Sequence, residues 1–267
     1  GEANAVAIRI ARAATGREVV AFCGYHGWHD WYLAANLTSG DQLNSHLLPG
    51  LEPNGVPESL RNSVRPFKYN RIDQLETLIK NYDLAAIKME VIRNKEPKDN
   101  FLNKVRQLAS DNGIVLIFDE CTTGFRETFG GIHKKYGVEP DIAVFGKALG
   151  NGYAVTSVLG RADVMDAANT SFISSTFWTE RIGSAAALKV LEVMEREKSW
   201  ETVTEIGLRL RRKWLELANH HGLSISVSGV PAIGGFAFNS ADELKYKTLI
   251  SQEMLEKGFL AGTSVYL

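Results

Sequence analysis

The fold is decided by residues 84–118, where two apolar strand patterns enclose one amphipathic helix pattern: LAAIKME at 84–90, NFLNKVRQLASDN at 100–112 and IVLIF at 114–118. The outer runs are short and apolar, as in buried strands, and the middle run repeats its apolar residues three and four positions apart. Two strands joined through a helix form a βαβ crossover, in which the strands run parallel. The sequence therefore predicts a parallel sheet covered by helices.

The same alternation extends to both sides of this unit. A helix is expected over residues 3–17 and a strand over 18–23, and two further strands are expected over 141–145 and 155–159. Residues 36–70 are rich in Asn, Pro, Gly and Ser, which predicts a long surface excursion. This order of elements favours the α/β class, with a mainly parallel sheet flanked by helices.

The last part of the chain follows a different pattern, in which long helices precede short strands. The expected elements are helices over 182–197 and 201–221, strands over 224–228 and 235–238, a helix over 241–257 and a strand over 259–266. We therefore expect a large α/β domain at 1–195 and a smaller α+β domain at 196–267. The first methionine is Met89, and the chain ends inside an expected strand, so we expect truncation at both ends.

The composition is that of an ordinary globular protein. The 267 residues include 30 Lys and Arg against 31 Asp and Glu, a formal net charge of −1, and 45% are hydrophobic. A generally basic nucleic-acid or membrane-surface binder is excluded by this balance. No run approaches the roughly 18 apolar residues of a membrane span, and no leader pattern opens the chain. With only two cysteines, Cys23 and Cys121, we expect a cytoplasmic protein with reduced thiols.

Polar side chains follow three of the expected strands. Tyr25 and His26 come after the first, Asp119 and Glu120 after the strand at 114–118, and Lys147 after the strand at 141–145. In an open α/β sheet, ligands bind outside the carboxyl ends of the strands. If these strands are parallel neighbours, an aromatic ring, an acid and an amine meet in one crevice.

This combination suits pyridoxal phosphate. That cofactor needs a lysine to hold it as a Schiff base, a carboxylate to keep its pyridine nitrogen protonated and a flat group against its ring. Lys147 would form the imine, be displaced by an incoming amine and then move the α-proton of the substrate. Asp119 would be the carboxylate. Glycines around Lys147 allow the backbone to approach the cofactor closely.

Several separate motifs resemble those of class III pyridoxal-phosphate-dependent aminotransferases, within which the glutamate-1-semialdehyde 2,1-aminomutase-like branch is most similar. The motifs are GEANAVAIR at 1–9, GYHG at 24–27, LIFDECTTGFR at 116–126, YGVEPD at 136–141 and FGKALGNG at 145–152. The resemblance covers nearly the whole chain and keeps the order of the family. It implies a fold type I transferase.

The resemblance also implies roles for individual residues. Lys147 would be the imine lysine, Asp119 the pyridinium partner, and Tyr25 the stacking ring with His26 beside it. The further cofactor contacts that it implies are Gly1 near the phosphate, Cys121 under the ring, Asn94 at the ring hydroxyl and Thr176 at the phosphate of a partner subunit. A homodimer follows from the role of Thr176.

We interpret the chain as an aminotransferase that moves an amino group from an amino donor to a keto or aldehyde acceptor. Two alternatives stay open: an intramolecular aminomutase, and an inactive fragment or structural homologue. Residues 89–97 depart from the Glu-Pro-Val and glycine-rich loop of the family, which favours a substrate other than that of the aminomutase. Arg93, Arg126 and Arg181 are candidate clamps for a substrate carboxylate or phosphate.

Plainer interpretations exist for each of these residues. Lys147 could be a solvated loop charge, the pair Asp119 and Glu120 a helix cap or metal-binding turn, and Thr176 a helix cap. Cys121 could be a nucleophile, although no base stands next to it. His26 and His29 have a spacing compatible with zinc but lack a third ligand nearby, so we expect no metal site.

Overall fold

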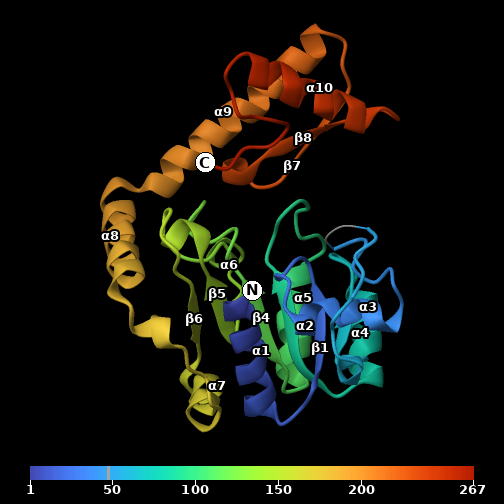
Figure 1. Ribbon diagram of the computed structural model, residues 1–267, viewed down its shortest axis with the longest axis vertical. Helices are drawn as coiled ribbons and strands as arrows, with labels where there is room; N and C mark the ends of the chain where they lie inside the picture. Colours follow the sequence, from blue (N-terminus) through green and yellow to red (C-terminus); the bar gives the residue numbers. More distant parts are fainter. Residues whose placement is uncertain (47–48) are drawn as a thin grey trace.

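The structure is a computed structural model that describes residues 1–46 and 49–267. A six-stranded sheet forms its centre (Figure 1). The strand order is β2-β1-β3-β4-β5-β6. The strands are β1 (Val19–Cys23), β2 (Val64–Pro66), β3 (Leu84–Glu90), β4 (Val115–Asp119), β5 (Ile142–Phe145) and β6 (Ser157–Gly160). Strands β1 to β5 are parallel, and β6 pairs antiparallel with β5. The α/β class with a mainly parallel sheet is confirmed.

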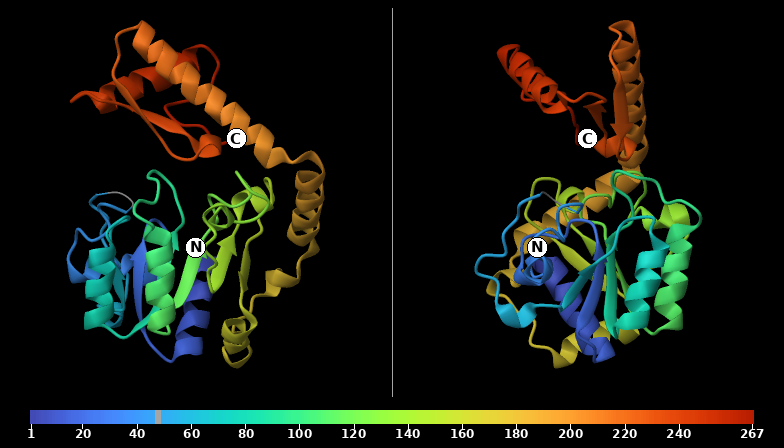
Figure 2. Two further views of the ribbon diagram at one scale, coloured as in Figure 1. Left: turned by 180° about the vertical axis from the view of Figure 1, so that it is seen from behind. Right: turned by 90° about the vertical axis from the view of Figure 1, so that its right-hand side faces the viewer.

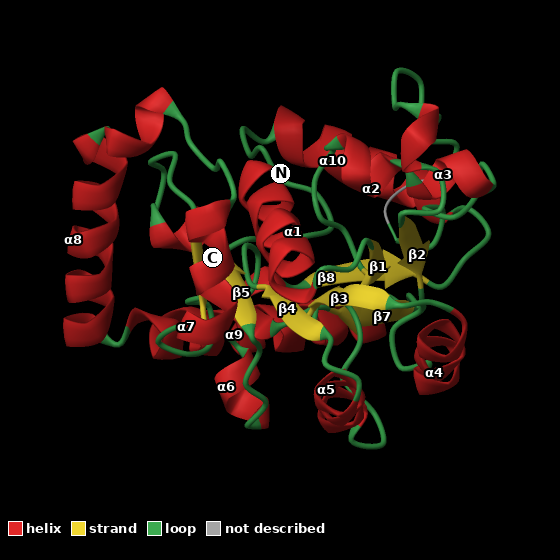
Figure 3. Cartoon of the chain, turned by 90° about the horizontal axis from the view of Figure 1, so that it is seen from below, coloured by secondary structure: helices red, strands yellow, loops and turns green. Residues whose placement is uncertain are grey.

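Helices cover both faces of this sheet (Figure 3). Helix α1 (Glu2–Thr15) packs on one face, and α4 (Ile72–Asn81) and α5 (Phe101–Asp111) cover the other. The shorter elements are α2 (Asp30–Leu33), α3 (Ala35–Thr38), α6 (His133–Tyr136) and α7 (Ala162–Met165), with 3-10 turns η1 (Glu58–Leu60), η2 (Lys147–Leu149), η3 (Asp166–Thr170), η4 (Thr176–Thr179) and η5 (Pro231–Ile233). No helix in the described ranges combines the length and the apolar character needed to cross a bilayer.

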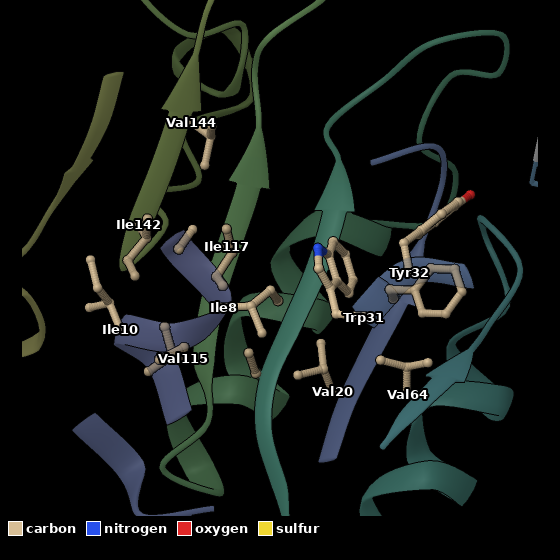
Figure 4. Close-up of a cluster of buried hydrophobic side chains, with 14 of the residues drawn as sticks. Ile8, Ile10, Val20, Trp31, Tyr32, Val64, Val115, Ile117, Ile142 and Val144 are labelled. Atoms are coloured by element: carbon tan, nitrogen blue, oxygen red, sulfur yellow. The ribbon is translucent and has the colours of Figure 1, made fainter. Parts of the chain in front are cut away.

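The core lies on both faces of the sheet because the side chains of each strand alternate between them. Between the sheet and α1, Ile8 and Ile10 meet Val115, Ile117 and Ile142 (Figure 4). Leu116 and Phe118, the alternate residues of β4, pack on the opposite face with residues of α5. Strand β3 is buried along its whole length, as expected for a central strand of a parallel sheet.

The chain after β6 leaves the sheet and builds a separate layer (Figure 2). Helix α8 (Arg181–Glu197) and helix α9 (Ser199–His220) lead to a two-stranded antiparallel sheet of β7 (Ile225–Ser228) and β8 (Gly235–Phe238), followed by α10 (Glu243–Glu256). The expected helix-then-strand order is present. A division into domains at residue 195 stays a prediction.

Two expectations about elements were wrong. Residues 36–70 hold not only surface loops but also β2, which pairs with β1 as an edge strand. That strand is three residues long and contains Pro66, so only its pairing with β1 identifies it, and an edge strand tolerates proline. The strand expected over 259–266 does not form, and its place is taken by an isolated bridge between Ser264 and Gly235.

A buried ion pair at the amino end of β5 should contribute much of the stability of this sheet. Asp141 accepts the Leu116 N–H at 2.7 Å and contacts the guanidinium groups of Arg106 at 2.9 Å and Arg161 at 3.0 Å. We expect Asp141→Asn to lower the free energy of unfolding by about 2 to 3 kcal/mol, because the buried carboxylate loses the charge that strengthens its hydrogen bonds to Arg106, Arg161 and the Leu116 N–H. Urea denaturation measures this change.

Asp163 provides the matched control. It pairs with the same Arg161, at 2.7 Å, but its side chain is 63% exposed. Asp163→Asn should leave the urea midpoint nearly unchanged, because exposed pairs contribute little. Equal effects of the two substitutions would refute the assigned role of Asp141.

Candidate active site

Four polar segments meet at the carboxyl edge of the sheet. Tyr25 and His26 follow β1, Glu90 ends β3, Asp119 ends β4, and Lys147 follows β5. Neighbouring strand ends are in register, with Glu90 opposite Asp119 and Asp119 opposite Val144. The expected placement of these residues at one edge is present, and it arises because parallel strands end together. That the ring, the acid and the amine share one crevice stays a prediction.

Asp119 is buried and held by three hydrogen bonds. Its Oδ2 accepts from Asn4 Nδ2 at 2.7 Å and lies 2.8 Å from His26 Nδ1, and its Oδ1 accepts from the Cys121 N–H at 3.1 Å. Burial alone would raise the pKa of Asp119, but the Lys88 charge and the His26 hydrogen bond outweigh burial and hold that pKa well below its usual range. Asp119 is thus an ionised carboxylate in a buried place.

His26 holds this carboxylate from the β1 side. Its Nε2 lies 3.0 Å from the carbonyl oxygen of Cys23, which can only accept, so Nε2 carries a proton. Its Nδ1 faces the ionised Asp119 and donates as well. The ring is completely buried and stacks near Trp31, at 6.2 Å between centroids. His26 thus bridges the ionised carboxylate and the backbone that follows β1.

A lysine lies below Asp119 inside the sheet. Lys88 of β3 is fully buried, and its Nζ finds no hydrogen-bond partner in the described ranges. Burial lowers the pKa of Lys88, against the attraction of Asp119, Cys121 and Glu90. Burial likewise raises the pKa of Glu90, against the charge of Arg93. Lys88 and Glu90 thus form a layer of buried ionisable groups next to Asp119.

Lys147 begins the 3-10 turn η2 directly after β5. Its backbone is left-handed, with a φ of 47°, which is costly for a non-glycine residue and typical of functional positions. Its Nζ donates to Thr122 Oγ1 at 2.7 Å, and its side chain lines a cavity of about 620 Å³. Unlike Asp119, Lys147 is exposed, so its amine can be reached by a ligand.

Cys121 lies close to both Asp119 and Lys147. Burial and the Asp119 charge raise the pKa of the Cys121 thiol to about 12, and both Lys88 and Lys147 act on it in the opposite direction. A thiol with this pKa is protonated near neutrality, which argues against Cys121 as a nucleophile. A Cβ added to Gly146 would stand 3.6 Å from Cys121 Sγ, so the backbone before Lys147 packs against this thiol.

The other residues singled out from the sequence are spread over several elements. Gly1 caps α1 beside the ring of His29, Tyr25 is half-buried near Tyr32, and Glu120 binds His133 and Thr123 as a structural residue. Asn94 is exposed in the loop after β3, and Thr176 is exposed on η4. Of the candidate clamps, Arg93 contacts Glu90, Arg126 lines the Lys147 cavity, and Arg181 is exposed at the start of α8.

Three residues at the site were missed in the sequence. Asn4 and Thr122 contact Asp119 and Lys147, and Lys88 lies beneath them. A signal existed for two of them: Asn4 is a polar residue on the apolar side of its helix, and Lys88 interrupts an otherwise apolar strand. A polar residue on a buried face indicates a partner there.

The sequence model described as Aminotransferase class-III matches residues 1–266. The chain belongs to the class III aminotransferases. This assignment confirms the resemblance to that family, including the likeness to its aminomutase branch.

Among class III relatives, the 3-aminobutyryl-CoA aminotransferase of Cloacimonas acidaminovorans (strain Evry) is 32% identical over 257 residues, which are 93% of this chain and 58% of that protein. The glutamate-1-semialdehyde 2,1-aminomutase of Sulfolobus acidocaldarius is 34% identical over 209 residues, 75% of this chain and 49% of that protein. The chain thus spans about half to three fifths of the length of these relatives.

Solved structures show the same fold. The omega-transaminase of Sphaerobacter thermophilus superimposes with a TM-score of 0.84 at 25% identity, covering 99% of this chain and 67% of that one. The FumI protein of Sphingopyxis sp. MTA144 has a TM-score of 0.87 at 24% identity, covering 100% of this chain and 63% of that one. Both are consistent with a fold type I transferase.

Pyridoxal phosphate is the cofactor that the class III family indicates, and the residues present fit it. The donor set contains an accessible amine, an ionised buried carboxylate and a half-buried tyrosine at one strand edge. The first turn of α1 has no side-chain cap, so its N–H groups are free for an anion. A Cβ on Gly27 would lie 2.7 Å from the Gly1 Cα. The loop that holds Tyr25 can therefore lie this close to the start of α1 only because residue 27 is glycine.

The histidine beside this site gives a pH-dependent prediction. Burial lowers the pKa of His46 to about 4, and His46 Nδ1 accepts the Gly24 N–H at 3.2 Å. The unfolded chain binds a proton at His46 below about pH 6.5, whereas the folded chain does not do so until about pH 4. Stability should therefore fall as the pH drops through this window.

Comparison with His46→Gln isolates the contribution of His46. From pH 7 to pH 5, the wild type should lose roughly 1 to 2 kcal/mol more unfolding free energy than His46→Gln, which keeps an acceptor but does not titrate. Chemical denaturation at both pH values measures the difference. Identical losses in the two proteins would show that His46 is not buried as described.

Proposed function

We propose that this class III chain is part of an aminotransferase that moves an amino group between a donor and a keto or aldehyde acceptor at Lys147. The observation that carries this proposal is the ionised, buried Asp119 at the same strand edge as the accessible amine of Lys147. Pyridoxal phosphate bound at this edge would supply an electron-accepting ring, and the cofactor would keep the amino group between the two half-reactions.

Each residue then has a task that its surroundings support. Asp119 keeps a negative charge at the ring nitrogen, since Asn4 and His26 fix its oxygens and Lys88 favours its ionised form. Lys147 Nζ would hold the cofactor, and as a free amine it would remove the proton from the carbon that carries the amino group. Thr122 Oγ1 accepts from Nζ and positions it.

The remaining cofactor contacts are proposed on placement. Tyr25 would lie against the ring and Gly1 near the phosphate, because α1 begins beside the loop that holds Tyr25. Cys121 would lie under the ring, next to both Asp119 and Lys147. Asn94 would reach the ring hydroxyl from the loop after β3. Residues 196–267 would form a small domain, and the free thiols Cys23 and Cys121 suit a cytoplasmic enzyme.

We further propose a homodimer that uses the segment around η4. Phe172 is 88% exposed and Phe177 81% exposed, and Trp178 and Ile182 are exposed beside them. Several large apolar side chains exposed within a short segment favour a protein interface there. In the dimer, Thr176 would reach the phosphate of the partner's cofactor.

Substitution of Thr176 tests this dimer contact. Thr176→Ala should weaken pyridoxal phosphate binding about tenfold, since a hydrogen bond to a charged group is lost. Fluorescence titration of the full-length apoprotein measures the affinity. Thr179→Ala, an exposed threonine three residues later, is the control and should bind normally. Unchanged affinity in a dimeric Thr176→Ala protein would contradict the contact.

The activity is tested by a screen of amino donors and acceptors that follows the cofactor absorbance in the full-length protein. Turnover that requires a separate donor such as glutamate or alanine supports the aminotransferase. Relatives named as aminomutases make intramolecular transfer the second candidate, and it predicts conversion of an amino aldehyde without any donor. A protein that takes up no pyridoxal phosphate would defeat both.

A further inference from the structure

A second cavity opens beside Gly24, at the start of the loop that holds Tyr25. It has a volume of about 330 Å³, at the lower end of the range for small-molecule sites. It lies where β1 and β3 end, and its lining is Cys23, Gly24, Ser45, His46, Lys68, Tyr69, Glu90, Arg93, Asn94 and Lys95. None of the tasks proposed above for the reaction uses its lysines.

The charge of this cavity is strongly positive. Lys68, Arg93 and Lys95 face one carboxylate, Glu90, which gives a local excess of two positive charges in a chain whose net charge is −1. Arg93 lies 3.5 Å from Glu90. Neither Lys68 nor Lys95 has an ion-pair partner among residues 1–46 and 49–267. Clustered cations without partners are the chemistry of an anion site.

One neutral group, His46, completes the set of donors. His46 accepts the Gly24 N–H through Nδ1, which leaves the proton of its neutral ring on Nε2. Lys68 and Lys95 belong to the same lining as His46, so their amines and the His46 ring share this cavity. Tyr69 is already engaged, because its hydroxyl donates to the Val91 carbonyl at 2.5 Å.

The cavity adjoins the proposed catalytic crevice. Glu90 accepts the Tyr25 N–H at 3.2 Å, and the Arg93 guanidinium lies 5.9 Å from the centre of the Tyr25 ring. A molecule that reacts beside Tyr25 can therefore place a distant group among these cations. This geometry links the cavity to substrate rather than to the phosphate of the cofactor, which is proposed to lie at the start of α1.

We propose that this cavity is the subsite for a dianionic group of the amino substrate, such as a phosphate monoester or a dicarboxylate. In the substrate, this group lies at a distance from the reacting carbon. The assignment rests on the proposed function, and the charge of the group follows from the excess of two cations. Lys68 and Lys95 make the contacts, with His46 as a neutral donor.

Titration calorimetry of the cofactor-loaded full-length protein tests the subsite, with inorganic phosphate, malonate and acetate as probes in a buffer free of these anions. We expect the two dianions to bind more tightly than acetate, and the tighter dianion identifies the group. The double variant Lys68→Ala/Lys95→Ala should bind both dianions at least about tenfold more weakly, because contacts to a charged group are lost. Lys80→Ala/Lys104→Ala, which removes two lysines of α4 and α5, is the control and should bind as the wild type does.

A paired-substrate assay links this subsite to the reaction. The rate at which phosphoethanolamine changes the cofactor absorbance should exceed that of ethanolamine, and the ratio should fall in the double variant. Equal anion affinity in the wild type and the double variant would overturn the subsite while leaving the proposed function intact. Failure to take up pyridoxal phosphate would instead contradict the proposed function. In that case, anion binding by Lys68→Ala/Lys95→Ala compared with Lys80→Ala/Lys104→Ala would still test whether the cavity binds anions.

Discussion

Lys147→Ala is expected to lower kcat/KM for amino transfer by about ten-thousandfold, because the enzyme loses both the amine that holds the cofactor and the base that moves the proton. The side chain of Lys147 is exposed and donates to Thr122, so its loss should leave the melting temperature close to that of the wild type. Stopped-flow absorbance with the best donor found in the screen measures the rate.

Two controls separate chemistry from packing. Lys104→Ala removes an exposed lysine from α5 and should keep full activity. Lys147→Arg keeps the positive charge but not the amine and should be as inactive as Lys147→Ala, since a guanidinium stays protonated. More than a tenth of the wild-type activity in either Lys147 variant would show that another group carries the reaction.

Asp119→Asn is expected to reduce kcat/KM by about a thousandfold, at the upper end of the loss seen when one preorganised electrostatic contact is removed. The substitution keeps the size of the side chain but removes its charge. It also places an amide near Asn4 and His26, both of which donate to the carboxylate in the native protein. Cofactor affinity should fall as well, and fluorescence titration checks that loss independently of turnover.

The control for Asp119 is Asp111→Asn, which alters an exposed carboxylate at the end of α5. It should leave both kcat/KM and cofactor affinity unchanged. If Asp119→Asn bound the cofactor as tightly as the wild type and retained its activity, the ring nitrogen would need another partner. Asn4→Ala should have a smaller effect than Asp119→Asn, because His26 and the Cys121 N–H still hold the carboxylate.

The central sheet could be predicted because apolar runs mark the buried strands directly. Asp119 and Lys147 followed from the same runs, since a polar residue just past a strand has a defined place at the sheet edge. Strand β2 could not be found this way, because three residues that include Pro66 carry no periodic signal and depend on pairing with β1. The strand expected near the C-terminus was wrong for the converse reason: its apolar pattern is not matched by pairing, because the segment meets β8 through a single bridge at Gly235, and Leu260 is fully exposed.

At the site, too, residues next to strand ends could be predicted from the sequence, whereas contacts between distant segments could not. Asn4 is 115 positions from Asp119 in the sequence, so its hydrogen bond to that carboxylate is set by how α1 packs on the sheet. Lys88 could have been noticed as a charge in an apolar strand, but only the register with β4 brings it close to Asp119. Contacts of this kind require the tertiary structure.

The account depends most directly on which lysine carries the cofactor. The full-length protein should be loaded with pyridoxal phosphate, reduced with borohydride, digested and analysed by mass spectrometry. We predict that the mass of the reduced cofactor is found on the peptide that contains Lys147. Attachment to Lys88, the buried lysine beside Asp119, or to no lysine at all would contradict the proposed site.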